Sequence, residues 1–297
     1  MTPREDDCDA PFLIAPNPAD PRLTRPVTGA DQHGRAVETR VVEERPLTLW
    51  LNGREIVTVM TIGDHPALLA VGYLLNQRML RPDDEITAID VDEETESVVV
   101  RTPAATDFEA KLRKKTRTSG CAVGTVFGDV MEALGDLRLP PAQVRTSDLY
   151  ALARRINTAP SLYLEAGAIH GTVLCRGGRP LVYMEDVGRH NAVDKIAGWM
   201  RMNDVSGADK LLYTTGRLTS EMVVKCALMG IPALASRSGF TARGVELARQ
   251  TDLTLIGRMR GRRFLCLSGE HRLTRDADPE DQPEEHPRHR RKAAGDD

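Results

Sequence analysis

Residues 210–236 read KLLYTTGRLTSEMVVKCALMGIPALAS, and their pattern changes twice within this short stretch. Lys210–Thr214 is apolar and β-rich, which predicts a strand, and Ile231–Ser236 predicts a second one. Between them, Ser220–Met229 has the length and apolar spacing of a helix that begins after a hydroxyl cap. Strands that alternate with helices predict a three-layer α/β domain, with a sheet between two layers of helices.

The same alternation continues on both sides of this stretch, so we expect the α/β domain to span residues 146–270. Thr146, Ser147 and Asp148 are helix-capping residues at the start of a helix expected to reach Asn157. Further strands are expected at 168–175, 180–184, 253–258 and 264–267, and further helices at 191–202 and 241–250.

An Asn52-Gly53 pair between two β-rich runs is the strongest hairpin signal in the N-terminal part. A helix is expected after Asp64, and strands are expected near 85–92 and 97–101. Together with the hairpin, these elements predict a smaller α+β domain. The chain divides as follows: a disordered arm at 1–38, the α+β domain at 39–117, a cysteine loop and connector at 118–145, the α/β domain at 146–270 and a disordered tail at 271–297.

The amino-acid composition disfavours some classes of protein, such as membrane-spanning proteins and proteins that stack on nucleic-acid bases. The 297 residues are 41% apolar and 28% charged with a net charge of -3, which is typical of a soluble globular protein. Aromatic residues make up only 4%, which disfavours base stacking on nucleic acid, and no apolar run is long enough to span a membrane. Five irregularly spaced cysteines do not form a disulfide framework, so a reducing cytoplasm is expected.

Cys121 differs from the other cysteines because it lies between two glycines, Gly120 and Gly124, in a segment without apolar periodicity. We expect a loop there. The preceding run 111–117 carries five cationic residues, and positive charge lowers the pKa of a neighbouring thiol. Cys8 lies in a polar tail, whereas Cys175, Cys226 and Cys266 each lie inside an apolar run and are expected to behave as small buried hydrophobes.

Three successive strand-to-helix junctions each bring an arginine, namely Arg189, Arg217 and Arg237, beside glycine and a helix start. Ligands of open α/β sheets bind at the carboxyl ends of strands, and arginine with helix N–H groups suits phosphate or another anion. Ser236 and His190 lie at the same junctions. His170, just inside a strand, is expected to be structural. Hydroxyls here also serve as ordinary helix caps, which would explain one residue at each junction.

The segment 185–195, EDVGRHNAVDK, resembles the hallmark of the formate dehydrogenase accessory sulfurtransferase family, FdhD/NarQ. Segments 216–225, 231–238 and 253–257 resemble further signatures, and the similarity extends from about Glu43 to Phe264. The resemblance implies a cytidine-deaminase-like fold for the α/β domain and a homodimer. It also implies transfer of sulfur from a cysteine desulfurase to the molybdenum cofactor, a bis(molybdopterin guanine dinucleotide), for formate dehydrogenase.

In such a protein Cys121 would carry the sulfur as a persulfide. The resemblance adds a cofactor-binding segment after the last long strand, and a guanine nucleotide such as GDP would fit the same site, with no zinc or other metal. The expected cofactor-binding residues are Arg189, His190, Arg217, Ser236, Arg237, Arg258, Met259, Arg260, Gly261, Arg262 and Arg263. Relatives often have Cys-x-x-Cys at the loop, whereas this chain has Gly124 in the second position.

Two other functions stay open from the sequence. A nucleobase deaminase would need His-x-Glu and Pro-Cys-x-x-Cys at successive helix starts, and neither 190–192 nor 220–222 supplies those ligands. A non-catalytic chaperone would bind the molybdenum cofactor and deliver it without sulfur chemistry. It would share the anion-binding residues, so only the behaviour of Cys121 separates it from a sulfurtransferase.

Overall fold

A six-stranded mixed sheet forms the centre of the computed structural model, which describes residues 11–103, 116–118, 121–125, 134 and 137–280. The strand order is β11-β10-β12-β13-β14-β15. Strands β12, β13 and β14 are parallel, and β11 runs in the same direction because both β11 and β12 are antiparallel to β10. The strands are β10 (His170–Arg176), β11 (Arg179–Asp186), β12 (Lys210–Thr214), β13 (Ala233–Ser236), β14 (Thr254–Arg260) and β15 (Arg263–Ser268).

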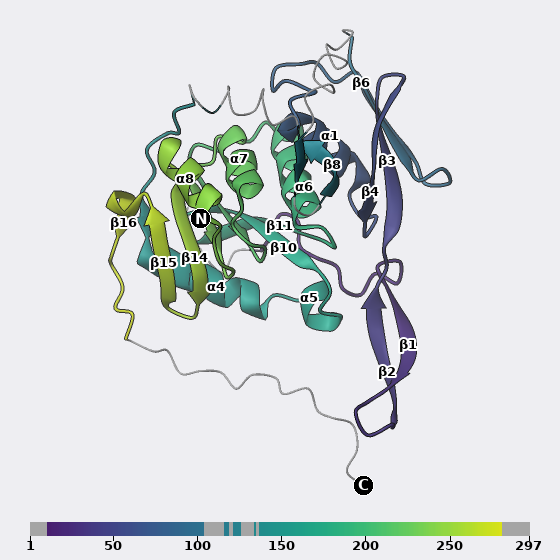
Figure 1. Cartoon of the computed structure of the whole chain (residues 1–297), viewed down its shortest axis with the longest axis horizontal. Coiled ribbons are helices and arrows are strands. Elements are labelled where there is room, and N and C mark those ends of the chain that lie inside the picture. The colour runs from purple at the N-terminus through teal and green to yellow at the C-terminus, as the bar shows by residue number, and fades with distance from the viewer. Residues whose placement is uncertain (1–10, 104–115, 119–120, 126–133, 135–136, 281–297) are drawn as a thin grey trace, which may run out of the picture.

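Helices cover both faces of this sheet, as the sequence predicts (Figure 1). Apolar residues of α6 (Arg189–Met202), α7 (Ser220–Leu228) and α8 (Ala242–Gln250) share one core cluster with one set of strand residues. The alternate strand residues, including Val173 and Tyr213, point to the other face and pack against α4 (Thr146–Thr158). The chain is therefore a mixed α/β protein with three layers in this part.

The N-terminal part has a second sheet of four strands in the order β4-β3-β6-β5. The hairpin predicted around Asn52-Gly53 is confirmed, and Asn52 takes a left-handed conformation with φ 54°. One helix, α1, packs on this sheet, and it begins after His65 rather than after Asp64. The elements are β3 (Arg45–Leu51), β4 (Arg54–Thr61), α1 (Pro66–Asn76), β5 (Ala88–Asp92) and β6 (Ser97–Arg101).

Close contact between α1 and α6 joins the two parts. A Cβ atom added at Gly72 would lie 1.7 Å from the carbonyl oxygen of Asp194, and one added at Gly198 would lie 2.0 Å from that of Leu68. Only glycine lets the two helix backbones approach this closely. The two expected domains thus share a tight helix pair.

The chain is ordered beyond the expected limits at both ends. The disordered arm expected at 1–38 instead contains β1 (Thr24–Ala30), which pairs with β2 (Ala36–Val42) in a hairpin that projects from the body (Figure 1). Most of its side chains are exposed, so no apolar alternation marks it in the sequence. The tail expected from 271 contributes η1 (Glu270–Arg272) and β16 (Leu273–Thr274), which pairs with β9 (Val144–Arg145).

After β16, Asp276 caps the start of α4 from a distant part of the sequence. Its carboxylate accepts hydrogen bonds from the backbone N–H and the hydroxyl of Ser147, at 3.0 and 2.7 Å. A short helix, α5 (Leu162–Glu165), precedes β10. None of the helices in the described residues is long and apolar enough to cross a membrane.

Candidate functional site

The carboxyl ends of β11, β12, β13 and β14 meet at one edge of the central sheet, because these four strands run in the same direction. The three predicted arginine junctions follow the first three of these strands. The structure therefore places Arg189, Arg217 and Arg237 along one edge, where open α/β sheets bind their ligands.

An open cavity of about 600 Å³ lies at this edge, and its lining is predominantly polar and cationic. Arg237 comes from the loop after β13, and Arg258 and Arg260 come from the end of β14. All three residues are exposed, and the Cζ atom of Arg237 lies 5.2 Å from the ring centre of Tyr163. The complete lining is Thr215, Arg237, Ser238, Gly239, Arg258 and Arg260.

Arg258 has an unusual backbone that brings it to the cavity. Its φ is 55°, and the pairing of β14 with β15 shifts register between Gly257 and Arg260, which marks a bulge. The freed Arg258 N–H donates to the carbonyl oxygen of Ser238, at 2.8 Å, on the neighbouring junction. Bulges often redirect side chains next to functional sites, and left-handed arginine is strained, so the fold maintains this conformation at a cost.

Two more of the predicted arginines lie near His170 at the same edge. The charges of Arg189 and Arg217, with that of His190, help to lower the pKa of the half-buried His170 imidazole, although burial is the main cause. Arg189 packs over Gly216, where an added Cβ would lie 2.9 Å from the arginine Cδ. The cationic surface thus extends beyond the cavity toward His170.

The remaining predicted cofactor-binding residues do not line the cavity. Ser236 is fully buried, and its hydroxyl donates to the carbonyl oxygen of Gly216 at 2.7 Å. His190 is 7% exposed, and its Nε2 lies 3.2 Å from a carboxylate oxygen of Glu221, while burial lowers the pKa of its imidazole. Met259 is buried in the core beside α4.

Gly261, Arg262 and Arg263 lie at the turn between β14 and β15. Gly261 has φ 58°, a value that glycine adopts readily. The Arg262 guanidinium lies 5.3 Å from the ring centre of Tyr150 and donates to the carbonyl oxygen of Asp278. Arg263 is exposed on β15. Of the segment 258–263, therefore, only Arg258 and Arg260 face the cavity.

Much of the hallmark segment 185–195 is buried and forms a charged network below the surface. Lys195 is completely buried, and its Nζ lies 2.6 Å from a carboxylate oxygen of Asp186, pairs with Asp64 and donates to the carbonyl oxygen of Glu185 at 2.9 Å. Burial alone would lower the pKa of the Lys195 ammonium, but the two carboxylates outweigh it and raise the pKa. Asn191 adds hydrogen bonds to Asp186 and to the carbonyl oxygen of Met60.

A second buried pair continues this network. Lys225 of α7 donates to both carboxylate oxygens of Asp194, at 2.7 Å each, and Asn76 of α1 donates to the same carboxylate. These contacts tie α1 to α6 and α7. The network accordingly fixes the helices whose starts present the cationic edge.

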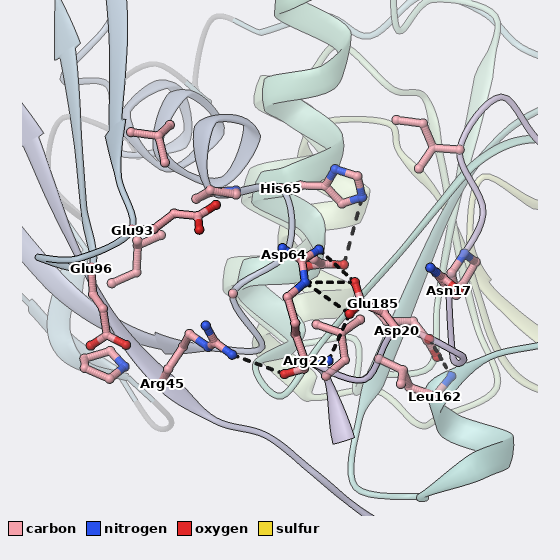
Figure 2. A pocket seen from close by; sticks show the side chains of 18 of the residues that line it. Asn17, Asp20, Arg22, Arg45, Asp64, His65, Glu93, Glu96, Leu162 and Glu185 are labelled. Atoms are coloured by element: carbon pink, nitrogen blue, oxygen red, sulfur yellow. Dashed lines mark hydrogen bonds and ion pairs between the residues drawn. The ribbon is translucent and has the colours of Figure 1, made fainter. Parts of the chain in front are cut away.

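A separate cavity of about 410 Å³ lies between the N-terminal segment, the β5–β6 turn and α5 (Figure 2). Several of the carboxylates that line it have partners within the fold. Asp20 pairs with Arg22 at 2.8 Å, and Glu185 accepts from the backbone N–H groups of Leu162 and Tyr163 at 2.7 and 3.2 Å. Burial raises the pKa of Glu185 to about 7. Asp20 and Glu185 are thus held by neighbouring groups, and we assign no ligand to this cavity.

Cys121 begins a strand rather than lying in the loop expected from its glycines. It is the first residue of β8 (Cys121–Thr125), which pairs with β7 (Thr116–Thr118) so that Cys121 lies opposite Thr118. Residues 111–115 of the basic run, the cysteine Cys8 and residues 126–133 of the expected connector lie outside the described residues.

Of the three cysteines expected to be buried, two are. Cys175 and Cys226 are completely buried, and burial raises the pKa of both thiols. Cys266 is half-buried, and the pKa of its thiol is also raised by burial. Among the side chains that the structure describes, none of the His, Cys, Asp and Glu residues form a group of three that could hold a metal ion.

Comparison with known proteins identifies the group to which the chain is related. The model of the FdhD/NarQ family matches residues 42–274, which is most of the chain and includes the cavity and the buried network. The chain belongs to the FdhD/NarQ family. The match begins at the last residue of β2, so the projecting hairpin precedes it.

Named relatives support the family assignment. The chain is 31% identical to the sulfur carrier protein FdhD of Bacillus subtilis over 234 residues, covering 77% of this chain and 88% of the relative. It is 28% identical over 242 residues to the protein of the same name from Listeria monocytogenes, covering 80% and 93%. These FdhD/NarQ relatives are named as sulfur carriers.

A solved structure is also similar. A protein from Desulfotalea psychrophila, assigned as a formate dehydrogenase accessory protein, superimposes with a TM-score of 0.69 at 27% identity. The match covers 85% of this chain and 99% of that one. The mixed α/β fold is therefore that of a solved FdhD/NarQ-type structure.

Sequence reasoning missed some of the cavity residues. Thr215, Ser238 and Gly239 line it but were not among the expected binding residues, although they belong to the same junctions as Arg217 and Arg237. His170 was expected to be structural, yet it lies close to Thr215 at the cavity wall. Thr215, Ser238 and Gly239 could have been identified from the sequence because each lies within two residues of Arg217 or Arg237.

Proposed function

We propose that this chain is a sulfur carrier that accepts persulfide sulfur on Cys121 from a cysteine desulfurase and passes it to a molybdenum cofactor bound at the cationic edge. The client would be a bis(molybdopterin guanine dinucleotide) destined for formate dehydrogenase. The names of the family relatives support sulfur carriage and the accessory role. The cavity that brings Arg237, Arg258 and Arg260 together is the observation that carries the cofactor part.

The cavity fits the charge of such a client. Two nucleotide diphosphate linkages carry several negative charges, and guanidinium groups bind phosphate oxygens in paired, charge-assisted hydrogen bonds. Thr215 and Ser238 also line the cavity among the arginines, and their hydroxyls would add neutral donors. A guanine nucleotide such as GDP would occupy the same cavity in part.

The sulfur steps would occur at the Cys121 thiolate. The thiolate attacks the terminal sulfur of the desulfurase persulfide, a new S–S bond forms on Cys121, and the desulfurase cysteine leaves as a thiolate. In the second step this S–S bond breaks and the terminal sulfur becomes a sulfide ligand of molybdenum. That change takes two electrons, which the reduced metal of the client supplies.

The choice of Cys121 rests partly on the other described cysteines. Cys175 and Cys226 are buried with raised pKa values, so neither supplies a thiolate at neutral pH. One acceptor thiolate suffices for a carrier, so Gly124 in place of a second loop cysteine is compatible with this chemistry. The likeness to cytidine deaminases, the cytoplasmic location and the homodimer stay predictions of the same proposal.

A complementation experiment tests the proposal in cells. A strain that lacks its own carrier would receive the wild-type chain, Cys121→Ala or Cys266→Ala, and formate dehydrogenase activity would be measured. We expect activity with the wild type and with Cys266→Ala, and none with Cys121→Ala. Full activity with Cys121→Ala would favour a chaperone that delivers the cofactor without sulfur chemistry.

A further inference from the structure

Thr215 is fixed at the wall of the arginine cavity by two hydrogen bonds to one residue. Its backbone N–H donates to the carbonyl oxygen of Gly171 at 2.9 Å, and its Oγ1 accepts from the N–H of Gly171 at 3.0 Å. Because the hydroxyl oxygen already accepts one hydrogen bond, its own hydrogen can be donated to another group. Thr215 lines the same cavity as Arg237, Arg258 and Arg260.

The neighbour of this hydroxyl on the other side is His170. The Nδ1 atom of His170 lies 3.4 Å from Thr215 Oγ1, and the His170 side chain is half-buried. Thr215 therefore stands between the cavity and an imidazole. A hydroxyl in this position can donate either to the imidazole nitrogen or to a ligand oxygen, but it has only one hydrogen.

Burial and the charges around His170 disfavour the protonated form of its imidazole when the cavity is empty. Arg189 and His190 from α6 and Arg217 from the loop after β12 oppose a positive charge, while Asp186 of β11 favours one. Burial and these cations together lower the pKa of His170 below its ordinary value. A neutral imidazole leaves Nδ1 able to accept the Thr215 hydrogen.

We propose that His170 and Thr215 complete the anion site, and that binding of a diphosphate ester in the arginine cavity is coupled to uptake of one proton by His170. This inference rests on the anion site of the proposed function. Thr215 turns its hydrogen toward a ligand oxygen when the anion binds. His170 Nδ1 then takes a proton from solvent and donates it in a hydrogen bond to Thr215 Oγ1.

The coupling has a definite sign. The bound anion offsets the charges of Arg189 and Arg217, so the pKa of His170 rises on binding. Between the lower pKa of the free protein and the higher pKa of the complex, each bound anion brings one proton. In that range the affinity rises up to about tenfold for each pH unit of acidification. His170 is thus a positioning residue that acts through Thr215.

Isothermal titration calorimetry with GDP-mannose tests the inference on the full chain. This probe presents a diphosphate ester whose phosphates do not titrate near neutral pH, so any proton taken up belongs to the protein. The titration is run at about pH 7 in two buffers with different heats of ionisation, which counts protons, and is repeated at about pH 6 and about pH 8. The variants are His170→Asn, Thr215→Val and Thr215→Ser, with His33→Asn in the exposed hairpin turn as the matched control.

The expected result is uptake approaching one proton for the wild type, His33→Asn and Thr215→Ser. His170→Asn is expected to bind the probe with no uptake and a flat pH profile, and Thr215→Val to bind more weakly without uptake. Binding by the wild type with no proton uptake, or unchanged uptake in His170→Asn, would overturn the role of His170 alone. No binding by the folded wild-type protein would overturn the anion site itself, and the inference with it.

Discussion

The Nζ atom of Lys195 lies 2.6 Å from a carboxylate oxygen of Asp186, and both side chains are completely buried. Asp64, just before α1, shares the same ammonium group. The pair therefore links the start of α1 to the end of β11 and to α6. This arrangement shows why the segment 185–195 is rich in charged residues: several of them hold the cationic edge in place from beneath.

Replacement of Lys195 by methionine is expected to destabilise the fold by about 3–5 kcal/mol, because it leaves buried Asp186 without its cation. Urea unfolding followed by circular dichroism measures the change. The matched control is Arg101→Met, which breaks an exposed pair with Asp90 and should cost less than about 1 kcal/mol. Equal effects of the two substitutions would show that the buried network is not structural.

The helix contact between α1 and α6 predicts a strong effect of one methyl group. Gly198→Ala places a Cβ atom 2.0 Å from the carbonyl oxygen of Leu68, so the helices must separate. We expect a loss of about 1–3 kcal/mol or more, as for other overpacked sites. Gly29→Ala is the control, because no described atom lies within 4 Å of its added Cβ. A thermal melt that is unchanged by Gly198→Ala would contradict the packing.

The arginine cavity predicts selective losses of anion affinity. Arg258→Ala or Arg260→Ala should each weaken GDP-mannose binding by about 1.5–3 kcal/mol, the usual contribution of a charged hydrogen bond. The interaction should also weaken as salt concentration rises. Arg101→Ala, in the N-terminal sheet, keeps the fold and should leave affinity unchanged. Comparable losses in all three variants would mean that nonspecific charge explains the binding.

Glu185 predicts a pH dependence of stability. Burial raises the pKa of this carboxyl to about 7 in the folded protein, above its value in the unfolded chain. A raised folded pKa means that the folded state retains the proton more strongly. The stabilisation that protonated Glu185 gives to the folded state is therefore fully present below about pH 4.5 and is lost as pH rises through about 7. The free energy of unfolding falls by about 3 kcal/mol over this range.

The Glu185→Gln variant tests this dependence, since glutamine cannot titrate. Urea unfolding at a series of pH values should show a flatter decline of the unfolding free energy between about pH 4.5 and 7 in the variant than in the wild type. The absolute stability of the variant is also expected to change, because Leu162 and Tyr163 donate to both carboxylate oxygens. An identical slope in the two proteins would refute the raised pKa.

The α/β layers could be predicted from the sequence because turn residues and apolar runs mark their strands and helices clearly. The Asn52-Gly53 pair fixed one hairpin, and the apolar runs around residues 210–236 gave the parallel strands with their connecting helix. The hairpin of β1 and β2 was missed because both faces of its strands are largely exposed. Helix α5 was missed because it has only four residues.

The candidate site was predicted in outline, since parallel strands necessarily bring Arg189, Arg217 and Arg237 to one edge. The sequence could not show which residues turn inward. Ser236 and His190 follow the same strands yet are buried, whereas a bulge turns Arg258 toward the cavity. Such choices depend on long-range packing and on a backbone angle, neither of which has a local sequence signal.

The most direct measurement of the central claim is intact-protein mass spectrometry after incubation with a cysteine desulfurase and cysteine. The wild-type chain and Cys266→Ala are expected to gain at least one sulfur atom, which a reductant removes, and Cys121→Ala is expected to gain none. Peptide mapping should place the sulfur on Cys121. Equal sulfur gain by Cys121→Ala, or no gain by the wild type under conditions where the desulfurase turns over, would contradict the claim that Cys121 carries sulfur.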